Sequence, residues 1–258
     1  MNDPDKVDIV IPCMDVYKAK IQSDRSIEKL KLRIVVRGYL YNKEIIGDNW
    51  SPTTSIRTLK YFLADVSKNK ASVKKLYFIR AFIQSNVKFR AFVKLDIRYV
   101  KYSPEYGNYF GRQLILKKKM YGMTNSGNIF SDKLTNWLIY EAWFKHSHFQ
   151  MSIYYKYEPE KSKWVFLSYV YECVYWYKYE ELGNWFVDTL GKGFHVNFLG
   201  YAHCFMSIRI SKLEDYSISV DQARYDKSAV SKYLFTATVK ENPNSHKTTL
   251  PHDMIFNK

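Results

Sequence analysis

Two tyrosines and one glutamate lie where apolar patterning predicts β-strands, and their chemistry limits what this chain could catalyse. The apolar segment 166–176 is interrupted at Tyr171-Glu172, where we expect it to fold back as an antiparallel hairpin. Tyr77 lies in another predicted strand, residues 76–83. A phenol has a pKa of about 10, so it stays protonated at neutral pH and is a poor ligand for Mg²⁺. Glu172 supplies the one carboxylate of the three, and a single carboxylate cannot hold two metal ions.

The net charge of +15 indicates a polyanionic partner, and nucleic acid is the partner that we expect. From Arg57 to Lys101 the sequence is rich in Lys and Arg, and its acidic residues are only Asp65 and Asp96. A solvated basic surface without a specific partner is the alternative. No membrane association is expected, because no basic amphipathic helix is evident and no apolar run reaches the roughly 20 residues that span a bilayer.

The cysteines argue against a disulfide framework. Cys13, Cys173 and Cys204 are far apart and form no Cys-x-x-Cys pair, so neither a disulfide framework nor a thiolate zinc site is expected. The N-terminal residues are acidic and polar, unlike a signal peptide. We therefore expect an intracellular protein, cytoplasmic or nuclear, that has no metal site and needs no cofactor in its present form.

Hydrophobic spacing predicts strands that alternate with helices. A helix is expected over residues 56–67, with Ser55 as its N-cap. Further helices are expected at about 130–142, 182–190 and 223–234. The other predicted strands are 9–11, 32–36, 91–95, 153–157, and a hairpin of 205–210 with 217–220. Together with the hairpin at Tyr171-Glu172, this order indicates an α+β fold.

Four further segments carry a family resemblance. They are the basic segment Glu28–Gly38, Trp50-Ser51-Pro52 followed by Ser55-Ile56-Arg57, Met120-Tyr121-Gly122-Met123, and Phe198-Leu199-Gly200 with Met206–Arg209. In this order and spacing they resemble the copia-type retrotransposon reverse transcriptase, the polymerase part of a Gag-Pol polyprotein. The resemblance runs from about Val10 to Leu234. It implies a right-hand polymerase palm and fingers with an antiparallel catalytic hairpin.

The resemblance also implies a domain organisation. Residues 1–240 would form one reverse-transcriptase-like domain. Within it, about 7–60 would be fingers-like, about 61–210 mainly palm, and about 211–240 the start of the thumb or connection. Residues 241–258 would form a loosely ordered tail.

The family's metal-binding positions match Tyr77, Tyr171 and Glu172. Active members carry aspartates there and use Mg²⁺, so this chain is expected to be inactive. Asp96 is the nearest substitute, but it falls where the family has no catalytic residue. The predicted nucleotide-binding residues are Lys31, Arg33, Arg37, Phe82, Tyr121, Gly122 and Asn125. Lys117, Lys118 and Lys119 are expected to contact nucleic-acid phosphates, with a solvated strand edge as the alternative.

Three functions compete. The first is an active RNA-directed DNA polymerase with an unrecognised set of metal ligands. The second is an inactive relative that binds RNA, DNA or a hybrid through its basic cleft, and the third is a decayed retroelement fragment. The chain begins within the fingers and stops before any RNase H domain, which favours the second and third. The sequence leaves the oligomeric state open, and we expect the second function.

Overall fold

The computed structural model describes residues 9–22, 26–40, 48–87, 89–94, 104–109, 111–158, 162–223, 226 and 229–230. These residues form two compact units. One unit contains Ile9–Ala202 with Lys212–Ile218, and the other contains His203–Ser211 with the residues from Ser219 onward. The predicted tail, 241–258, lies outside the described residues, as does most of the predicted helix 223–234. None of the described helices is long and apolar enough to cross a membrane.

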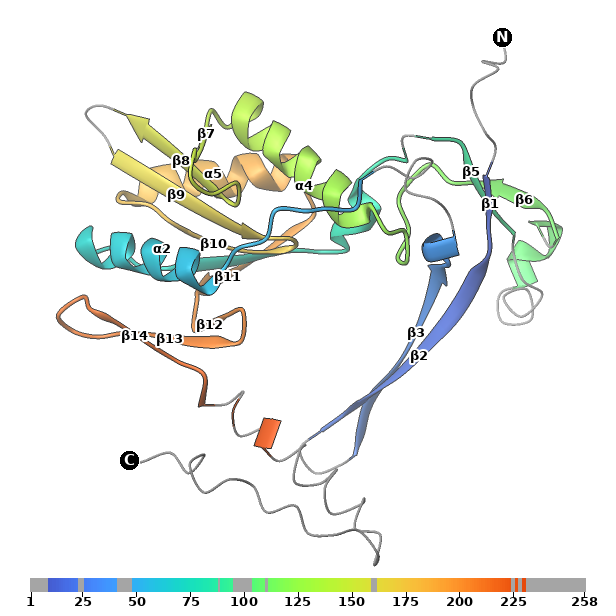
Figure 1. Cartoon of the computed structure of the whole chain (residues 1–258), viewed down its shortest axis with the longest axis horizontal. Coiled ribbons are helices and arrows are strands. Elements are labelled where there is room, and N and C mark those ends of the chain that lie inside the picture. Colours follow the sequence, from blue (N-terminus) through green and yellow to red (C-terminus); the bar gives the residue numbers. More distant parts are fainter. Residues whose placement is uncertain are drawn as a thin grey trace, which may run out of the picture. The chain divides into compact units, whose positions relative to one another are not determined.

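An antiparallel sheet of six strands forms the centre of the first unit (Figure 1). Its spatial order is β11-β4-β10-β9-β8-β7. The strands are β4 (Lys74–Phe78), β7 (Lys145–His146), β8 (Ile153–Glu158), β9 (Ser162–Tyr169), β10 (Glu172–Trp176) and β11 (Val196–Tyr201). Only Val170 and Tyr171 separate β9 from β10, so the chain folds back there as the sequence predicted.

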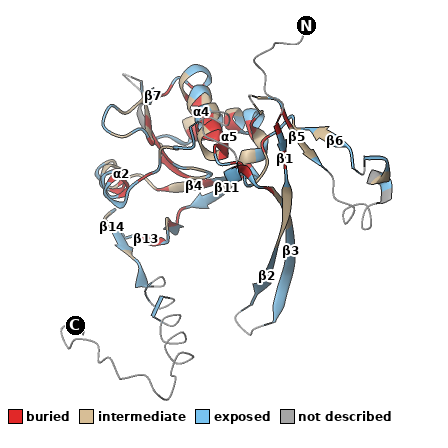
Figure 2. Cartoon of the chain, turned by 45° about the vertical axis from the view of Figure 1, so that its right-hand side comes forward, coloured by how far each residue is buried: buried red, intermediate tan, exposed pale blue. Residues whose placement is uncertain are grey.

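Helices cover both faces of this sheet (Figure 1). Helix α4 (Ser126–Asn136), its π-helical continuation η4 (Trp137–Glu141) and helix α5 (Glu180–Gly193) lie on one face, and α2 (Ile56–Lys68) lies on the other. Alternate strand residues point to opposite faces, so Leu76 and Phe78 of β4 pack into the α4–α5 core. Figure 2 shows the buried residues concentrated between the sheet and these helices.

Helix α2 confirms the helix predicted for residues 56–67. Ser55 is its N-cap, and its side-chain oxygen accepts a hydrogen bond of 3.1 Å from the backbone N–H of Thr58. The apolar residues at helical spacing form the buried face: Leu59, Phe62, Leu63 and Val66. The cap and the apolar face therefore define this helix locally, before tertiary packing adds to them.

The strand predicted for residues 76–83 is wrong beyond Phe78. Arg80 has a left-handed backbone (φ 51°), which turns the chain out of β4 and into the 3-10 helix η2 (Ala81–Gln84). The side-chain amide of Gln84 holds this turn by donating to the backbone carbonyls of Ile79 (2.7 Å) and His195 (2.9 Å). Phe82 consequently lies in η2 and not in a strand.

Smaller sheets complete the described structure. Strand β1 (Ile9–Ile11) pairs in parallel with β5 (Ala91–Lys94), which pairs with β6 (Gln113–Ile115). Strands β2 (Cys13–Ile21) and β3 (Ile27–Val36) form a long hairpin, which is largely exposed in Figure 2. Strands β12 (Cys204–Phe205), β13 (Ile208–Lys212) and β14 (Ile218–Asp221) form another sheet, and the neighbouring β13 and β14 confirm that a hairpin forms here. The predicted strand 205–210 is wrong as a single strand, because Met206 and Ser207 have left-handed backbones and the chain folds back there, pairing Phe205 with Ile208. Short 3-10 helices are η1 (Gly38–Leu40) and η3 (Pro104–Tyr109).

The end of β3 packs directly on the backbone of the segment 121–122. The Val36 N–H donates to the Tyr121 carbonyl at 2.8 Å. Gly122 has φ +92°, and a Cβ on it would overlap the carbonyl oxygen of Val36. A Cβ on Gly38 would likewise meet the Gly122 carbonyl oxygen, at 2.5 Å. Glycine at both positions therefore allows β3 to approach the loop that carries Tyr121.

Replacing Gly122 with alanine should destabilise the protein by at least about 2 kcal/mol, because backbone strain adds to a clash with Val36. Gly111→Ala is the matched control, since Gly111 also has a positive φ (+71°) but has open space around it. That control should cost only about 1 kcal/mol. Denaturant unfolding measures both changes, and equal costs would contradict the close approach.

Candidate functional site

The two tyrosines and the glutamate meet at the end of the β4–β10 pair. Glu172 lies opposite Tyr77 in the antiparallel register, and on its other side Glu172 pairs with Tyr169 of β9. The backbone N–H of Phe78 donates to the Tyr171 carbonyl at 2.8 Å. The sequence-based expectation that these three positions converge is therefore met in the geometry, although their functional roles stay a prediction.

Aromatic rings fill the space around this strand end. The rings of Tyr77 and Tyr171 lie edge to face with centroids 5.5 Å apart. The Phe82 ring is 6.3 Å from that of Tyr171 and 5.9 Å from that of Tyr121, again edge to face. Such pairs are worth about 0.5–1.5 kcal/mol beyond the area that they bury. Four rings from β4, η2, the loop before α4 and the β9–β10 turn thus pack together.

The remaining carboxylate is neutralised by a neighbour on β4. Glu172 forms an ion pair with Lys75, and their side chains are 25% and 16% exposed. Lys75 and Tyr77 are two residues apart on one strand and therefore share a face of the sheet with Glu172. A cation bound by Glu172 would have to displace this ammonium group or accept its repulsion.

The donors at this site do not fit a pair of Mg²⁺ ions. Burial, reinforced by Tyr121 and Tyr171, raises the pKa of Tyr77, so its phenol holds its proton even more firmly than usual. Mg²⁺ requires carboxylate, carbonyl or phosphate oxygens in near-octahedral order. Within the described residues, no group of three or more His, Cys, Asp and Glu side chains is placed to hold a metal ion. Asp96, the possible substitute ligand, lies outside the described residues.

A cavity of about 330 Å³ opens beside the aromatic rings. Its lining joins the β2–β3 hairpin, through Lys31 and Arg33, to the rings of the strand end: Tyr77, Phe82, Tyr121 and Tyr171. The positive charge of Arg33 also acts on the Tyr77 hydroxyl, and it opposes the rise in the pKa of Tyr77. Five of the predicted site residues, taken from distant parts of the sequence, therefore share one cavity with Tyr77.

Positive charge is concentrated along the exposed hairpin. The pKa of Lys31 is lowered, first by the neighbouring charge of Arg33 and further by Lys29, Lys20 and Lys18. Like charges held this close make the protonated form less favourable. A bound polyanion would relieve that repulsion, so the hairpin is suited to attract phosphate groups.

The other predicted nucleotide-binding residues do not line this cavity. Arg37 is exposed, and its backbone N–H donates to the Pro12 carbonyl at 2.8 Å. Gly122 permits the packing of β3 described above. Asn125 precedes α4, is buried, and accepts a hydrogen bond of 2.8 Å from the Lys119 ammonium group.

The run of three lysines is not uniformly exposed. Lys117 and Lys118 are exposed, but Lys119 is completely buried, bonded to Asn125 and placed over the Phe89 ring. The expectation that Lys119 contacts nucleic-acid phosphates is therefore wrong for this structure, because its ammonium group faces inward.

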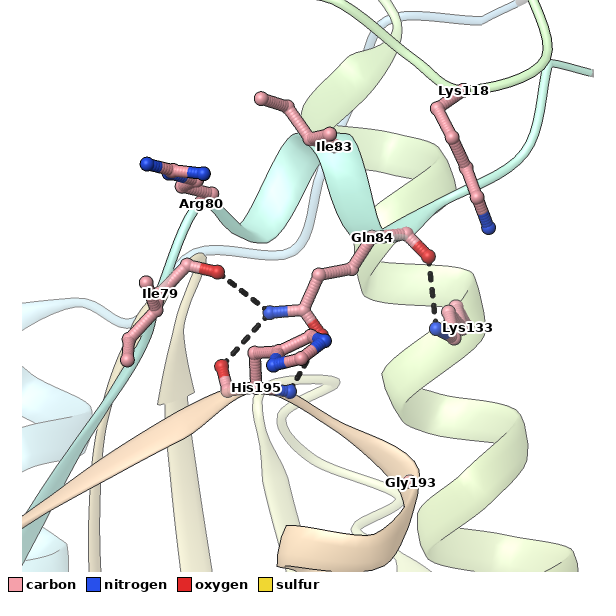
Figure 3. A pocket seen from close by; sticks show the side chains of 8 residues that line it. All are labelled: Ile79, Arg80, Ile83, Gln84, Lys118, Lys133, Gly193 and His195. Carbon is pink, nitrogen blue, oxygen red and sulfur yellow. Dashed lines mark hydrogen bonds between the residues drawn. The ribbon is translucent and has the colours of Figure 1, made fainter.

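Sequence reasoning missed a second cavity, of about 530 Å³, which Ile83 and Gln84 of η2 help to line. Arg80, Lys118, Lys133 and His195 line it together with Gln84 (Figure 3). Only Lys118 among these was predicted to bind nucleic acid. The residues come from four separate elements, so no local motif could have indicated the cavity.

A double-mutant cycle should detect the ion pair at the strand end. Glu172→Gln should lower the free energy of unfolding by about 1–2 kcal/mol in the parent protein. The same substitution should cost much less in a protein that already carries Lys75→Met, because its ion-pair partner is then absent. The control is Glu180→Gln, since Glu180 pairs with Lys74 but is 73% exposed, and its cost should stay below about 1 kcal/mol. A coupling energy of zero between Glu172 and Lys75 would mean that the carboxylate is not neutralised in solution.

Comparison with known proteins identifies the family. The family described as "Reverse transcriptase (RNA-dependent DNA polymerase)" matches residues 2–245. A search among curated proteins finds none that matches the chain. Because the match spans nearly all of its 258 residues, the chain belongs to this reverse transcriptase family.

Proposed function

We propose that this chain is a copia-type, catalytically inactive member of its family that binds nucleic acid. In this proposal the six-stranded sheet with α2, α4 and α5 is the polymerase palm, and the β2–β3 hairpin belongs to the fingers. The β9–β10 turn corresponds to the catalytic hairpin. The single observation that carries the proposal is the meeting of Tyr77, Tyr171 and Glu172 at one strand end.

The proposed inactivity rests on the chemistry of these three side chains. Members of the family that copy nucleic acid require Mg²⁺, which stabilises the charge that develops on the transferred phosphoryl group. Two phenols, of which that of Tyr77 has a raised pKa, and a carboxylate paired with Lys75 supply neither the charge nor the oxygen ligands for two such ions. We therefore assign no catalytic step to Tyr77, Tyr171 or Glu172.

Nucleic-acid binding is supported by the cavity beside the strand end. Its basic side chains, Lys31 and Arg33, can contact phosphates, and the guanidinium group of Arg33 can do so through two parallel hydrogen bonds. Its aromatic rings offer faces on which unpaired bases can stack, at about 1–3 kcal/mol per base. The net charge of +15 adds a long-range attraction for a polyanion.

Binding to single-stranded RNA or DNA should be weakly sequence-selective and should fall steeply with salt. Fluorescence anisotropy between about 50 and 200 mM salt measures the affinity, since each phosphate contact adds about 0.7 to the slope for a single strand. Lys31→Glu with Arg33→Glu should weaken binding by about tenfold or more and flatten the slope. The matched control, Lys60→Glu with Lys145→Glu, changes the net charge equally at exposed positions away from the cavity.

The purified parent protein should not extend a primer on an RNA or a DNA template, with either Mg²⁺ or Mn²⁺. Metal-dependent incorporation that survives Glu172→Ala would mean that another set of ligands holds the metals. If Lys31→Glu with Arg33→Glu and the control variant lose affinity equally, the binding depends on the net charge of the protein and not on the cavity. No binding near about 50 mM salt would favour a decayed fragment without a role.

A further inference from the structure

The second cavity is lined by basic side chains and has no carboxylate in its lining. It lies between η2, the segment before α4, α4 itself and the start of β11. Figure 3 shows Lys118 and Lys133 on one side of Gln84, with His195 below and Arg80 on the opposite side. The remaining lining residues are Ile79, Ile83 and Gly193. Of the four basic side chains, Lys133 is partly buried, and Arg80, Lys118 and His195 are exposed.

Two of these cations are held in place by hydrogen bonds. The Lys133 ammonium donates to the Gln84 backbone carbonyl at 2.9 Å, and the Lys118 ammonium donates to the Asn86 side-chain oxygen at 2.8 Å. Lys133 also lies over the Phe194 ring, 4.8 Å from its centroid. An ammonium group has three N–H donors, so each lysine keeps further donors for a ligand.

The two lysines also act on one another. Burial, together with the charge of Lys118, lowers the pKa of Lys133, so the protein holds these ammonium groups close enough to repel. Neither has a carboxylate partner among the described residues. A ligand with several negative charges would remove this repulsion and would bind both groups through charge-assisted hydrogen bonds.

Hydrogen bonds of the Gln84 side chain join the elements that frame the cavity. The Gln84 side chain donates to the carbonyls of Ile79 and His195, and its oxygen accepts from the His195 N–H at 3.0 Å. Two of these hydrogen bonds tie η2 to His195, the residue before β11, and the third ties η2 to Ile79, the residue after β4 (Figure 3). The cations therefore lie on a preorganised surface, which lowers the cost of ordering them around a ligand.

We propose that this cavity is a binding site for linked phosphate groups, separate from the cavity that Tyr77 lines. The ligand is either a free polyphosphate, such as a nucleoside triphosphate, or consecutive phosphates of a nucleic-acid backbone. Lys118 and Lys133 bind the phosphate oxygens directly, with Arg80 and His195 as further donors at the edge. The proposal does not depend on nucleic-acid binding by Lys31 and Arg33.

Calorimetric titration of the whole chain with sodium tripolyphosphate at constant ionic strength tests this site. Lys118→Gln with Lys133→Gln should weaken binding by about tenfold for each lysine removed, the value expected for a lost charged hydrogen bond. The matched control, Lys60→Gln with Lys145→Gln, removes the same charge from exposed positions outside this cavity and should bind like the parent. If the double variant melts at a lower temperature, Arg80→Gln replaces it, and weaker binding is again expected.

Two further experiments identify the ligand and distinguish this site from the proposed nucleic-acid site at Lys31 and Arg33. A short thymidine oligonucleotide without terminal phosphates displaces tripolyphosphate if the site takes a nucleic-acid backbone, and leaves it bound if the site takes free polyphosphate. In a Lys31→Glu, Arg33→Glu background, which removes the phosphate contacts of the first cavity, Lys118→Gln with Lys133→Gln should still weaken tripolyphosphate binding. The proposal is overturned if tripolyphosphate does not bind, if the control loses as much affinity as the cavity variant, or if only the Lys31 and Arg33 variant loses it.

Discussion

The antiparallel register between β4 and β10 brings Tyr77, Tyr171 and Glu172 together at one strand end. It sets Glu172 opposite Tyr77, and the two-residue turn then brings the Tyr171 carbonyl to the Phe78 N–H. A shift of one residue would turn Tyr77 toward the α4–α5 core and expose Phe78. Burial of Leu76 and Phe78 on one face thus holds Tyr77 on the other. The hydrophobic core and the site are therefore two consequences of one pairing.

Under the function proposed above, the exchange of aspartates for rings alters the stability of this strand end as well as its chemistry. Carboxylates clustered without metal repel one another, which raises their pKa values and costs folding free energy. The rings of Tyr77, Tyr171 and Phe82 instead attract through edge-to-face contacts, and Glu172 is offset by Lys75. The strand end consequently needs no metal ion to be stable. The strand end can therefore stay folded beside the β2–β3 hairpin through these contacts alone.

The sequence predicted correctly those elements that are determined by interactions between residues close together in the chain. Helix α2 followed from its apolar spacing and from Ser55, and the β9–β10 hairpin followed from two apolar runs around Tyr171. The convergence on Tyr77 came from family resemblance, because no local rule pairs strands about 95 residues apart. The end of β4 was missed because Gln84 binds the carbonyl of His195, which lies 111 residues away in sequence. Lys119 was misjudged because its burial depends on Asn125 and Phe89, which a run of lysines does not reveal.

We propose that Tyr77, Tyr171 and Glu172 occupy a former metal site, and the dependence of the melting temperature on Mg²⁺ measures whether they do. Restoring all three positions to aspartate should yield a protein that is less stable without metal and is stabilised by Mg²⁺ binding to the native state. At a concentration about 100 times the dissociation constant, this gain is about 2.7 kcal/mol, or a rise of several degrees. The parent and a variant with Tyr77→Asn, Tyr171→Asn and Glu172→Gln should not respond. Equal responses to Mg²⁺ in all three proteins would contradict the assignment of the site.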